Sequence, residues 1–229
     1  MEVDNIKLYI DGRWDLTDLN VLTRVYIQLY GLLYSLDMAD DYLDNEIQYI
    51  YGKYPWRGGF SAVNFYQNLF AKIPRKYKPI IKSIQYASPG FIELSQIVEV
   101  AKDVAKIVGY VSAALIAGNK TYSIIHKGMS ERKLTHINLR NKEVDILEQE
   151  RKFIHNSVVE ISDLMGVKKE TLAKLYFRNE ENELAVLKIL ASMYRRARDL
   201  AELQNKQKLD LQRAHHERSS TSKKNQSDV

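Results

Sequence analysis

The sequence predicts a mixed α+β or α/β protein: a small N-terminal sheet layer of about three strands, partly parallel, followed by a mainly helical C-terminal region. All four prolines lie between Pro55 and Pro89, and Gly166 is the only glycine after Gly128. Because both residue types disfavour helix interiors, the last hundred or so residues should be almost entirely helical. Eleven of the fifteen tyrosines precede residue 90, which concentrates β-favouring aromatic residues in the first part.

The length and composition are those of an ordinary globular chain. The 229 residues suit one large domain or two small ones, and the 45% hydrophobic and 28% charged fractions suffice for a core. We divide the chain into an α/β layer at residues 1–90, a helical region at 91–217 and a tail at 218–229. The tail, RSSTSKKNQSDV, is basic and almost without apolar residues, so we expect it to be disordered.

Composition also excludes some kinds of functional site and indicates the cellular compartment. The chain has no cysteine, which excludes disulfides, thiolate metal ligands and cysteine nucleophiles and suits a reducing compartment. The first residues, MEVDNIKLYI, lack the basic-then-apolar order of a signal peptide. The longest uncharged apolar run, residues 107–118, is shorter than the roughly 20 residues of a membrane-spanning helix. We therefore expect a cytoplasmic protein without a membrane span.

Three segments of the predicted layer have the features of β-strands. The clearest of them alternates Ile6, Leu8 and Ile10 on one face, with polar or aromatic residues between them. The other two are residues 46–52 and 79–87, in which apolar residues alternate less regularly.

Two helices are predicted between these strands. The first begins with Asp15 or Thr17 as its N-cap and has an apolar stripe at helical spacing, and the second spans residues 61–73. The order strand, helix, strand, helix, strand with short connections favours a sheet that is at least partly parallel. The stripe of the first helix consists of Leu19, Leu22, Tyr26, Leu29 and Leu33.

The segment SIQYASPGFIELSQIVEV, residues 83–100, predicts that a long helix begins directly after Ser88. Ser88 suits an N-cap, Pro89 suits the first helical position, and Glu93 falls in the positive first turn. A serine-nucleophile elbow needs glycine two residues before the serine, where Tyr86 stands, and a phosphate-binding loop needs a following Lys-Ser/Thr. We therefore interpret Ser88 as a helix cap rather than as a catalytic residue.

The helix predicted at residues 91–118 is amphipathic as far as Lys106 and apolar on every face after it. Such a segment must be buried, either by its own chain or by a partner. Our first functional hypothesis is a non-enzymatic adaptor or accessory subunit that docks a protein partner or a second copy through this helix, for example in a bacterial multi-protein defence system. The candidate interface residues are Leu94, Val98, Val104, Val108, Val111 and Leu115.

The alternative hypothesis is a nucleic-acid-binding regulator. Residues 158–177, VVEISDLMGVKKETLAKLYF, have a small residue at Ser162, a glycine four residues later and an apolar residue directly after that glycine. This pattern resembles the helix-turn-helix motif of DNA-binding regulators. The resemblance implies that the second helix contacts phosphates and base edges. The candidate nucleic-acid-binding residues, all within residues 158–178, are Lys168, Lys169, Thr171, Lys174 and Arg178.

The charge distribution is compatible with an anionic partner. Residues 1–70 contain five Lys/Arg and ten Asp/Glu, whereas residues 71–229 contain twenty-nine and nineteen, a balance of +10 in a chain of net charge +5. A solvated basic surface explains the same asymmetry, so charge alone does not choose between the two hypotheses.

Two shorter resemblances point to enzymes. The sequence DDYLD, residues 40–44, resembles the DDxxD motif of prenyl-transferring and terpene-cyclising enzymes, whose carboxylates hold Mg²⁺, but a second metal motif is absent. The sequences RKLTH, residues 132–136, and RKFIH, residues 151–155, resemble the Arg-His pairs of HEPN ribonucleases at a shorter spacing. We keep a HEPN-like ribonuclease as a distant alternative and predict no enzyme activity, no metal and no cofactor.

Overall fold

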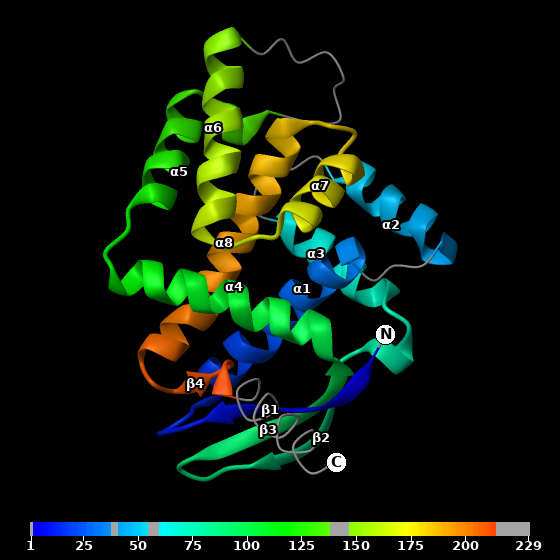
Figure 1. Ribbon diagram of the computed structural model, residues 1–229, viewed down its shortest axis with the longest axis vertical. Helices are drawn as coiled ribbons and strands as arrows, with labels where there is room; N and C mark the ends of the chain where they lie inside the picture. The colour runs from blue at the N-terminus through cyan, green and yellow to red at the C-terminus, as the bar shows by residue number, and fades with distance from the viewer. Residues whose placement is uncertain (1, 38–40, 55–59, 138–146, 214–229) are drawn as a thin grey trace, which may run out of the picture.

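The computed structural model describes residues 2–37, 41–54, 60–137 and 147–213, which form a four-stranded sheet with the helices stacked on one side of it (Figure 1). The strands are β1 (Val3–Ile10), β2 (Ile80–Gln85), β3 (Gly90–Ile97) and β4 (Leu209–Asp210). The α-helices are α1 (Leu16–Asp37), α2 (Asp41–Lys53), α3 (Phe60–Lys72), α4 (Val98–Ile116), α5 (Thr121–Glu131), α6 (Glu148–Leu164), α7 (Lys169–Arg178) and α8 (Glu183–Asn205). Two short 3₁₀ helices are η1 (Arg75–Tyr77) and η2 (Leu134–His136). The predicted tail at 218–229 lies outside the described residues.

The sheet is antiparallel throughout, so the prediction of a partly parallel sheet is wrong. Its strand order is β2-β3-β1-β4, and each neighbouring pair is antiparallel. The error arises from residues 46–52, which belong to α2 and not to a strand. The buried side chains there are Ile47, Ile50 and Tyr51, whose spacing of three and four residues is that of a helix. Without that strand, β2 and β3 simply form a hairpin beside β1.

Residues 90–97, which the sequence predicts as the first turns of the long helix, form strand β3. Buried and half-buried positions alternate along it, and all eight of its residues pair with β1. Helix α4 therefore begins at Val98 and not directly after Ser88. Ser88 lies in the β2–β3 turn, where its hydroxyl donates a hydrogen bond to the Asp11 carboxylate. Pairing with a distant strand has overridden a local helix-start signature.

Helix α1 lies in the middle of the core. The N-cap prediction is confirmed for Asp15, whose carboxylate accepts a hydrogen bond from the backbone N–H of Asp18 at 2.8 Å. The predicted stripe is confirmed as well, because four of its five members are buried and Leu19 packs against the core. The buried members are Leu22, Tyr26, Leu29 and Leu33.

Two tyrosines of α1 fasten this helix to the inner face of the sheet. The Tyr26 hydroxyl donates to Gln96 Oε1 at 2.8 Å. The Tyr30 hydroxyl accepts from the backbone N–H of Ile97 at 3.0 Å and donates to the carbonyl of Tyr77 at 2.8 Å. Burial raises the pKa of both tyrosines far above the ordinary value, so both hydroxyls remain protonated donors.

Helices α4 and α8 continue the same core. Helix α8 packs against α1, α4 and α6, and one hydrophobic cluster contains buried residues from β1, α1, α4 and α8. The predicted division at residue 90 falls at the first residue of β3, which pairs with both β1 and β2, and the sheet is not confined to the N-terminal part because it also contains β4. Among the described residues, no helix is both long enough and apolar enough to cross a membrane.

Two positions on α4 test this burial. Val111 is fully buried, whereas Ile116 is 76% exposed. We expect Val111→Asn to lower the free energy of unfolding by about 3 kcal/mol, because it buries an amide without a partner and removes apolar packing. The same change at Ile116 should cost less than about 0.5 kcal/mol. Urea unfolding followed by circular dichroism measures both, and equal losses would contradict the described packing.

Candidate protein-interaction surface

The residues predicted to form an interface on the long helix lie inside the molecule. Leu94 is on β3, facing the core, and Val98 is the first residue of α4. Val104, Val108 and Val111 are fully buried, mostly beneath the other helices. Leu115 is partly buried against the same core. The chain itself therefore covers most of the predicted interface residues, but Tyr110 and Ile116 of the same helix are 49% and 76% exposed, so the expected burial on every face is wrong in part. A partner must be sought at another surface.

The helix-turn-helix segment adopts the predicted local geometry. Gly166 lies between α6 and α7 with φ of +59°, in the left-handed region that favours glycine. The backbone N–H of Gly166 donates to the carbonyl of Asp163, and that of Val167 donates to the carbonyl of Ser162, both at 3.0 Å. A Cβ at residue 166 would also lie 2.6 Å from the Tyr110 ring, so space as well as φ demands glycine.

Four of the five candidate nucleic-acid-binding side chains contact acidic residues of this chain. Lys168 pairs with Asp103 of α4 at 2.8 Å, an ion pair that raises the pKa of the lysine. At Asp37, the end of α1, Lys174 forms an ion pair at 3.1 Å and the Thr171 hydroxyl donates at 3.3 Å. We call these contacts, together with the Arg178–Asp44 pair described next, the α7 clasp.

Arg178 is the most buried charged member of the clasp. It is 7% exposed, and its Nη2 lies 2.5 Å from Asp44 Oδ1 on α2. Gln48 of α2 also donates to the backbone carbonyl of Arg178 at 3.0 Å. Of the five candidates, only Lys169 is exposed without a contact of this kind among the described residues. The inward face of α7 thus fixes α7 to α1, α2 and α4, and we do not propose that it binds DNA.

The clasp can be tested at the ion pair of Arg178, its most buried charged residue. We expect Asp44→Asn to lower the free energy of unfolding by about 1–2 kcal/mol, because it leaves the buried Arg178 guanidinium without a countercharge. The matched change Glu148→Gln breaks an exposed pair with Lys152, whose charged atoms are 3.8 Å apart, and should cost less than about 0.5 kcal/mol. Chemical unfolding of both variants gives the comparison. If the clasp does not stabilise the fold, the two variants will lose the same free energy of unfolding.

Lys188 is a buried lysine on α8 that holds η2 in place. Its ammonium donates to the carbonyls of Ile137 at 2.8 Å and Thr135 at 3.4 Å. Burial lowers the pKa of Lys188 to about 8 from its ordinary value of 10.5. The folded chain therefore releases this proton at a lower pH than the unfolded chain does.

This depressed pKa predicts a pH dependence of stability. Below pH 8 both states hold the proton, so the full penalty of burying the charge is present; above it only the unfolded state stays protonated, and stability rises with pH. Relative to Lys188→Met, the wild type should gain about 2 kcal/mol in free energy of unfolding between pH 7.5 and 10. Unfolding curves at several pH values measure the difference in free energy of unfolding between the two proteins. Both proteins contain the same tyrosines, so the titration of these tyrosines does not contribute to that difference. A constant difference would contradict the depressed pKa.

Residues of the short enzyme-like motifs also form contacts with other residues of this chain. Of the DDYLD sequence, Asp44 belongs to the clasp, and residue 40 lies outside the described residues. Arg132 stacks on Phe153 at 4.2 Å from the ring centre. His155 Nδ1 lies 2.8 Å from Glu183 Oε1, which also accepts a hydrogen bond from the Tyr176 hydroxyl at 3.3 Å. Within the described ranges, no group of three or more His, Asp or Glu side chains is arranged to hold a metal.

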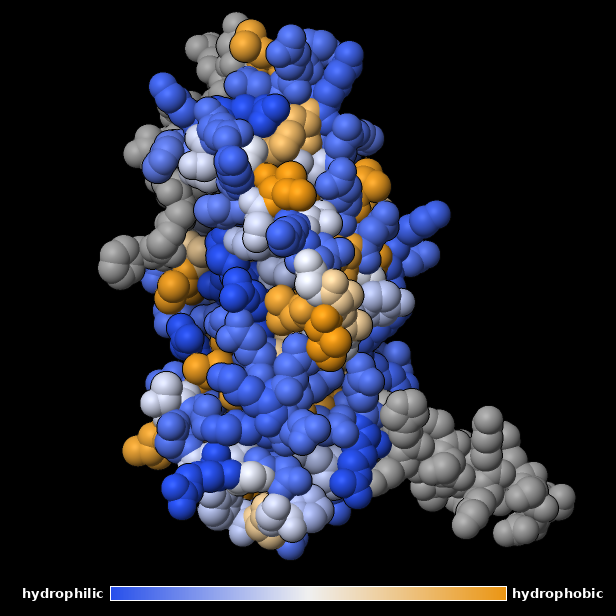
Figure 2. All heavy atoms as spheres, turned by 90° about the vertical axis from the view of Figure 1, so that its left-hand side faces the viewer, coloured by the Kyte–Doolittle hydropathy of each residue, from blue (hydrophilic) through white to orange (hydrophobic). Residues whose placement is uncertain are grey.

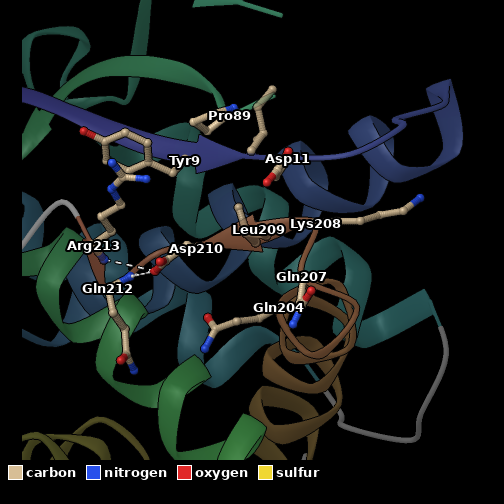
Figure 3. A pocket seen from close by; sticks show the side chains of 11 residues that line it. Tyr9, Asp11, Pro89, Gln204, Gln207, Lys208, Leu209, Asp210, Gln212 and Arg213 are labelled. Atoms are coloured by element: carbon tan, nitrogen blue, oxygen red, sulfur yellow. Dashed lines mark hydrogen bonds between the residues drawn. The ribbon is translucent and has the colours of Figure 1, made fainter. Parts of the chain in front are cut away.

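A polar hollow of about 370 Å³ lies beside the end of β1, between Pro89 and the turn that joins α8 to β4 (Figure 3). Asp11 accepts the Ser88 hydrogen bond, which lowers the pKa of its carboxyl. Lys208 extends away from the hollow and pairs with Asp18 at 2.6 Å. Asp210 accepts two backbone N–H groups within 3.0 Å. Each of these three side chains is thus already engaged within the chain, and the guanidinium of Arg213, which also lines the hollow, lies 4.3 Å from the centre of the Tyr9 ring.

Strand β2 is different, because it is a sheet edge with exposed apolar side chains that no other element covers within the part of the chain that the structure describes. It pairs with β3 on one side only, and all six of its residues are exposed. Its isoleucines are Ile80, Ile81 and Ile84, the last two 53% and 55% exposed. An uncovered edge offers a row of backbone donors and acceptors to another strand, and most natural edges are protected against this by charge or shortness. In β2 the only charged side chain is Lys82.

A β-bulge in β2 sets which way the isoleucines face. Ile81 lies opposite Leu94 and Ile84 lies opposite Ile92, with Lys82 as the extra residue. Leu94 and Ile92 are buried on the core side of the sheet, so both isoleucines face that side although they are three residues apart. The core-facing apolar surface of the sheet therefore continues onto β2, beyond the helices that cover its centre.

The opposite edge of the sheet is protected. Strand β4 pairs with only Tyr9 and Ile10 of β1, and the exposed residues along the rest of β1 include the polar residues Asp4, Asn5 and Lys7. The Asp4 carboxylate accepts from the backbone N–H of Asn5 at 2.6 Å. Of the two edges, β2 is therefore the one suited to receive a strand.

Other exposed apolar side chains lie on helices. Figure 2 shows hydrophobic side chains in separate patches on the face where α5 meets the end of α4, and the exposed residues there include Ile116 and Ile124. The backbone groups within a helix are already hydrogen-bonded to one another, so these patches lack the row of backbone donors and acceptors that the edge of β2 offers.

The sequence predicts a strand at residues 79–87 but does not identify this strand as a binding site. The signal that was available is the broken alternation of PIIKSIQY, in which Ile81 and Ile84 are three residues apart in a strand. That β2 is an edge depends on the strand order, which local pattern does not contain.

No protein-family model matches the chain, and neither a curated protein nor a solved structure shows significant similarity to it.

Proposed function

We propose that this protein is a non-enzymatic interaction module that docks another polypeptide by strand addition at β2. The exposed edge of β2, with two core-facing isoleucines beyond the helical cover, is the observation that supports this function. In strand addition, backbone hydrogen bonds supply affinity and alternate side chains supply specificity. The expected setting is that of a cytoplasmic accessory subunit in a bacterial multi-protein system.

The interaction surface differs from the one that the sequence predicts. Helix α4 supports it indirectly, because α4 follows β3 without a break and anchors the sheet to the helices. The edge is therefore rigidly presented, which lowers the conformational entropy lost when a strand binds.

A labelled peptide tests the docking edge. The probe is a fluorescein-labelled peptide with the sequence KPIIKSIQY, residues 78–86, at low nanomolar concentration. We expect fluorescence anisotropy to rise as the folded chain is added up to about 100 μM, in the range of a single short added strand. The chain variant Ile84→Lys should bind at least tenfold more weakly, because it removes an apolar contact and adds charge at the edge.

Two controls make the peptide experiment decisive. Ile116→Lys places the same charge on an exposed site of α4 and should bind like the wild type. Melting temperatures of both variants should match the wild type, since both isoleucines are more than half exposed. Absence of binding, or equal binding by the Ile84→Lys variant, refutes strand addition at β2.

A further inference from the structure

We infer that the strand received by β2 is the β2 strand of a second copy of this chain, paired antiparallel about a twofold axis between Lys82 and Ser83. This inference rests on the proposed function and names its partner. In such a pair, Ile81 of one copy lies opposite Ile84 of the other, and Lys82 lies opposite Ser83. The two sheets then form one continuous sheet across the axis.

The facing pattern of β2 is the first reason for this choice. Register with β3 places Ile81 and Ile84 on the core side, and Ser83 with Glu93 on the other side. As the extra residue of the bulge, Lys82 shares the Glu93 position with Ser83. From Ile80 to Gln85 the side chains therefore face the outer, core, outer, outer, core and outer side of the sheet. This order is the same when the strand is followed in the opposite direction.

A palindromic pattern selects a copy of itself. Antiparallel neighbours that lie directly opposite must face the same side of the sheet. A regular strand alternates strictly, so it cannot oppose both isoleucines with core-facing side chains unless it has a bulge at the same place. The β2 strand of a second copy has that bulge at the required position.

Charge complementarity is the second reason. The Ser83 hydroxyl donates to Glu93 Oε2 at 2.9 Å, which places a carboxylate beside Ser83 on the outer side of the sheet. In the twofold pair, Lys82 of each copy lies opposite Ser83 of the other, and its long side chain can reach that carboxylate. Two ion pairs between copies follow from one sequence, and like charges are not placed opposite each other.

The symmetry also limits the size of the assembly. Pairing of one edge with itself is isologous, and it uses the β2 edge of each copy; among the described residues, the other edge carries β4 at Tyr9 and Ile10 and exposed polar side chains along the rest of β1. The expected assembly is a closed dimer rather than a fibre. A six-residue strand pair is a small contact beside the roughly 1,600 Å² of a standard interface, so the dimer should dissociate at micromolar concentrations.

Sedimentation velocity of the full chain between 1 and 200 μM tests the dimer. We expect the wild type to pass from monomer to dimer over this range, Ile84→Lys to stay monomeric, and Ile116→Lys to behave as the wild type. A wild type that is monomeric throughout, or a dimer that Ile84→Lys does not weaken, overturns the inference. Peptide binding by a monomeric chain would still support strand addition, so the two proposals fail separately.

A charge exchange tests the register itself. Lys82→Glu alone and Glu93→Lys alone each place like charges together twice in the dimer, so each variant alone should dimerise at least tenfold more weakly. An equal mixture of the two variants should restore dimers, because each mixed dimer contains one natural and one exchanged ion pair. Misfolded variants cannot restore each other in this way. Failure of the mixture to recover, with both variants folded and the wild type dimeric, overturns the proposed register.

Discussion

The antiparallel pairing of β1 with β3 is the constraint on which the rest of this structure depends. It joins residues 3–10 to residues 90–97 along their full length, across most of the first hundred residues. Helices α1, α2 and α3, which lie between the two strands in the sequence, pack on one side of the sheet that this pairing forms. The same pairing supplies the inner face to which Tyr26 and Tyr30 of α1 attach.

That pairing also decides which surfaces remain for a partner. Because β1 occupies one side of β3, the preceding strand of the hairpin is forced to the outside and becomes the edge. Because β3 ends at Ile97, α4 starts against the core, where it packs against α1, α6 and α8. The chain thus buries most apolar side chains of α4, apart from Tyr110 and Ile116, and leaves the isoleucines of the shorter strand β2 exposed, which is the reverse of what hydrophobicity alone suggests.

Charge follows a similar logic. The basic residues of α7 and its N-cap give the sequence the features of a nucleic-acid-binding helix, but Asp37, Asp44 and Asp103 come from three other helices and form ion pairs with three of them. A net positive charge in one part of the sequence therefore does not imply a positive surface there. Ion pairs between distant segments are decided by packing, and a count of charges along the chain contains no information about them.

The sequence by itself determined the features that depend on neighbours within a few residues. These include the alternation of β1, the cap and stripe of α1, the helical C-terminal part and the left-handed glycine between α6 and α7. Tertiary structure alone decided whether residues 46–52 and 90–97 were helix or strand, because short apolar runs satisfy either period until a partner is present. It also decided that β2 is an edge and that α7 faces inward. Strand order and side-chain exposure are properties of contacts between residues far apart in the chain, and no local period encodes them.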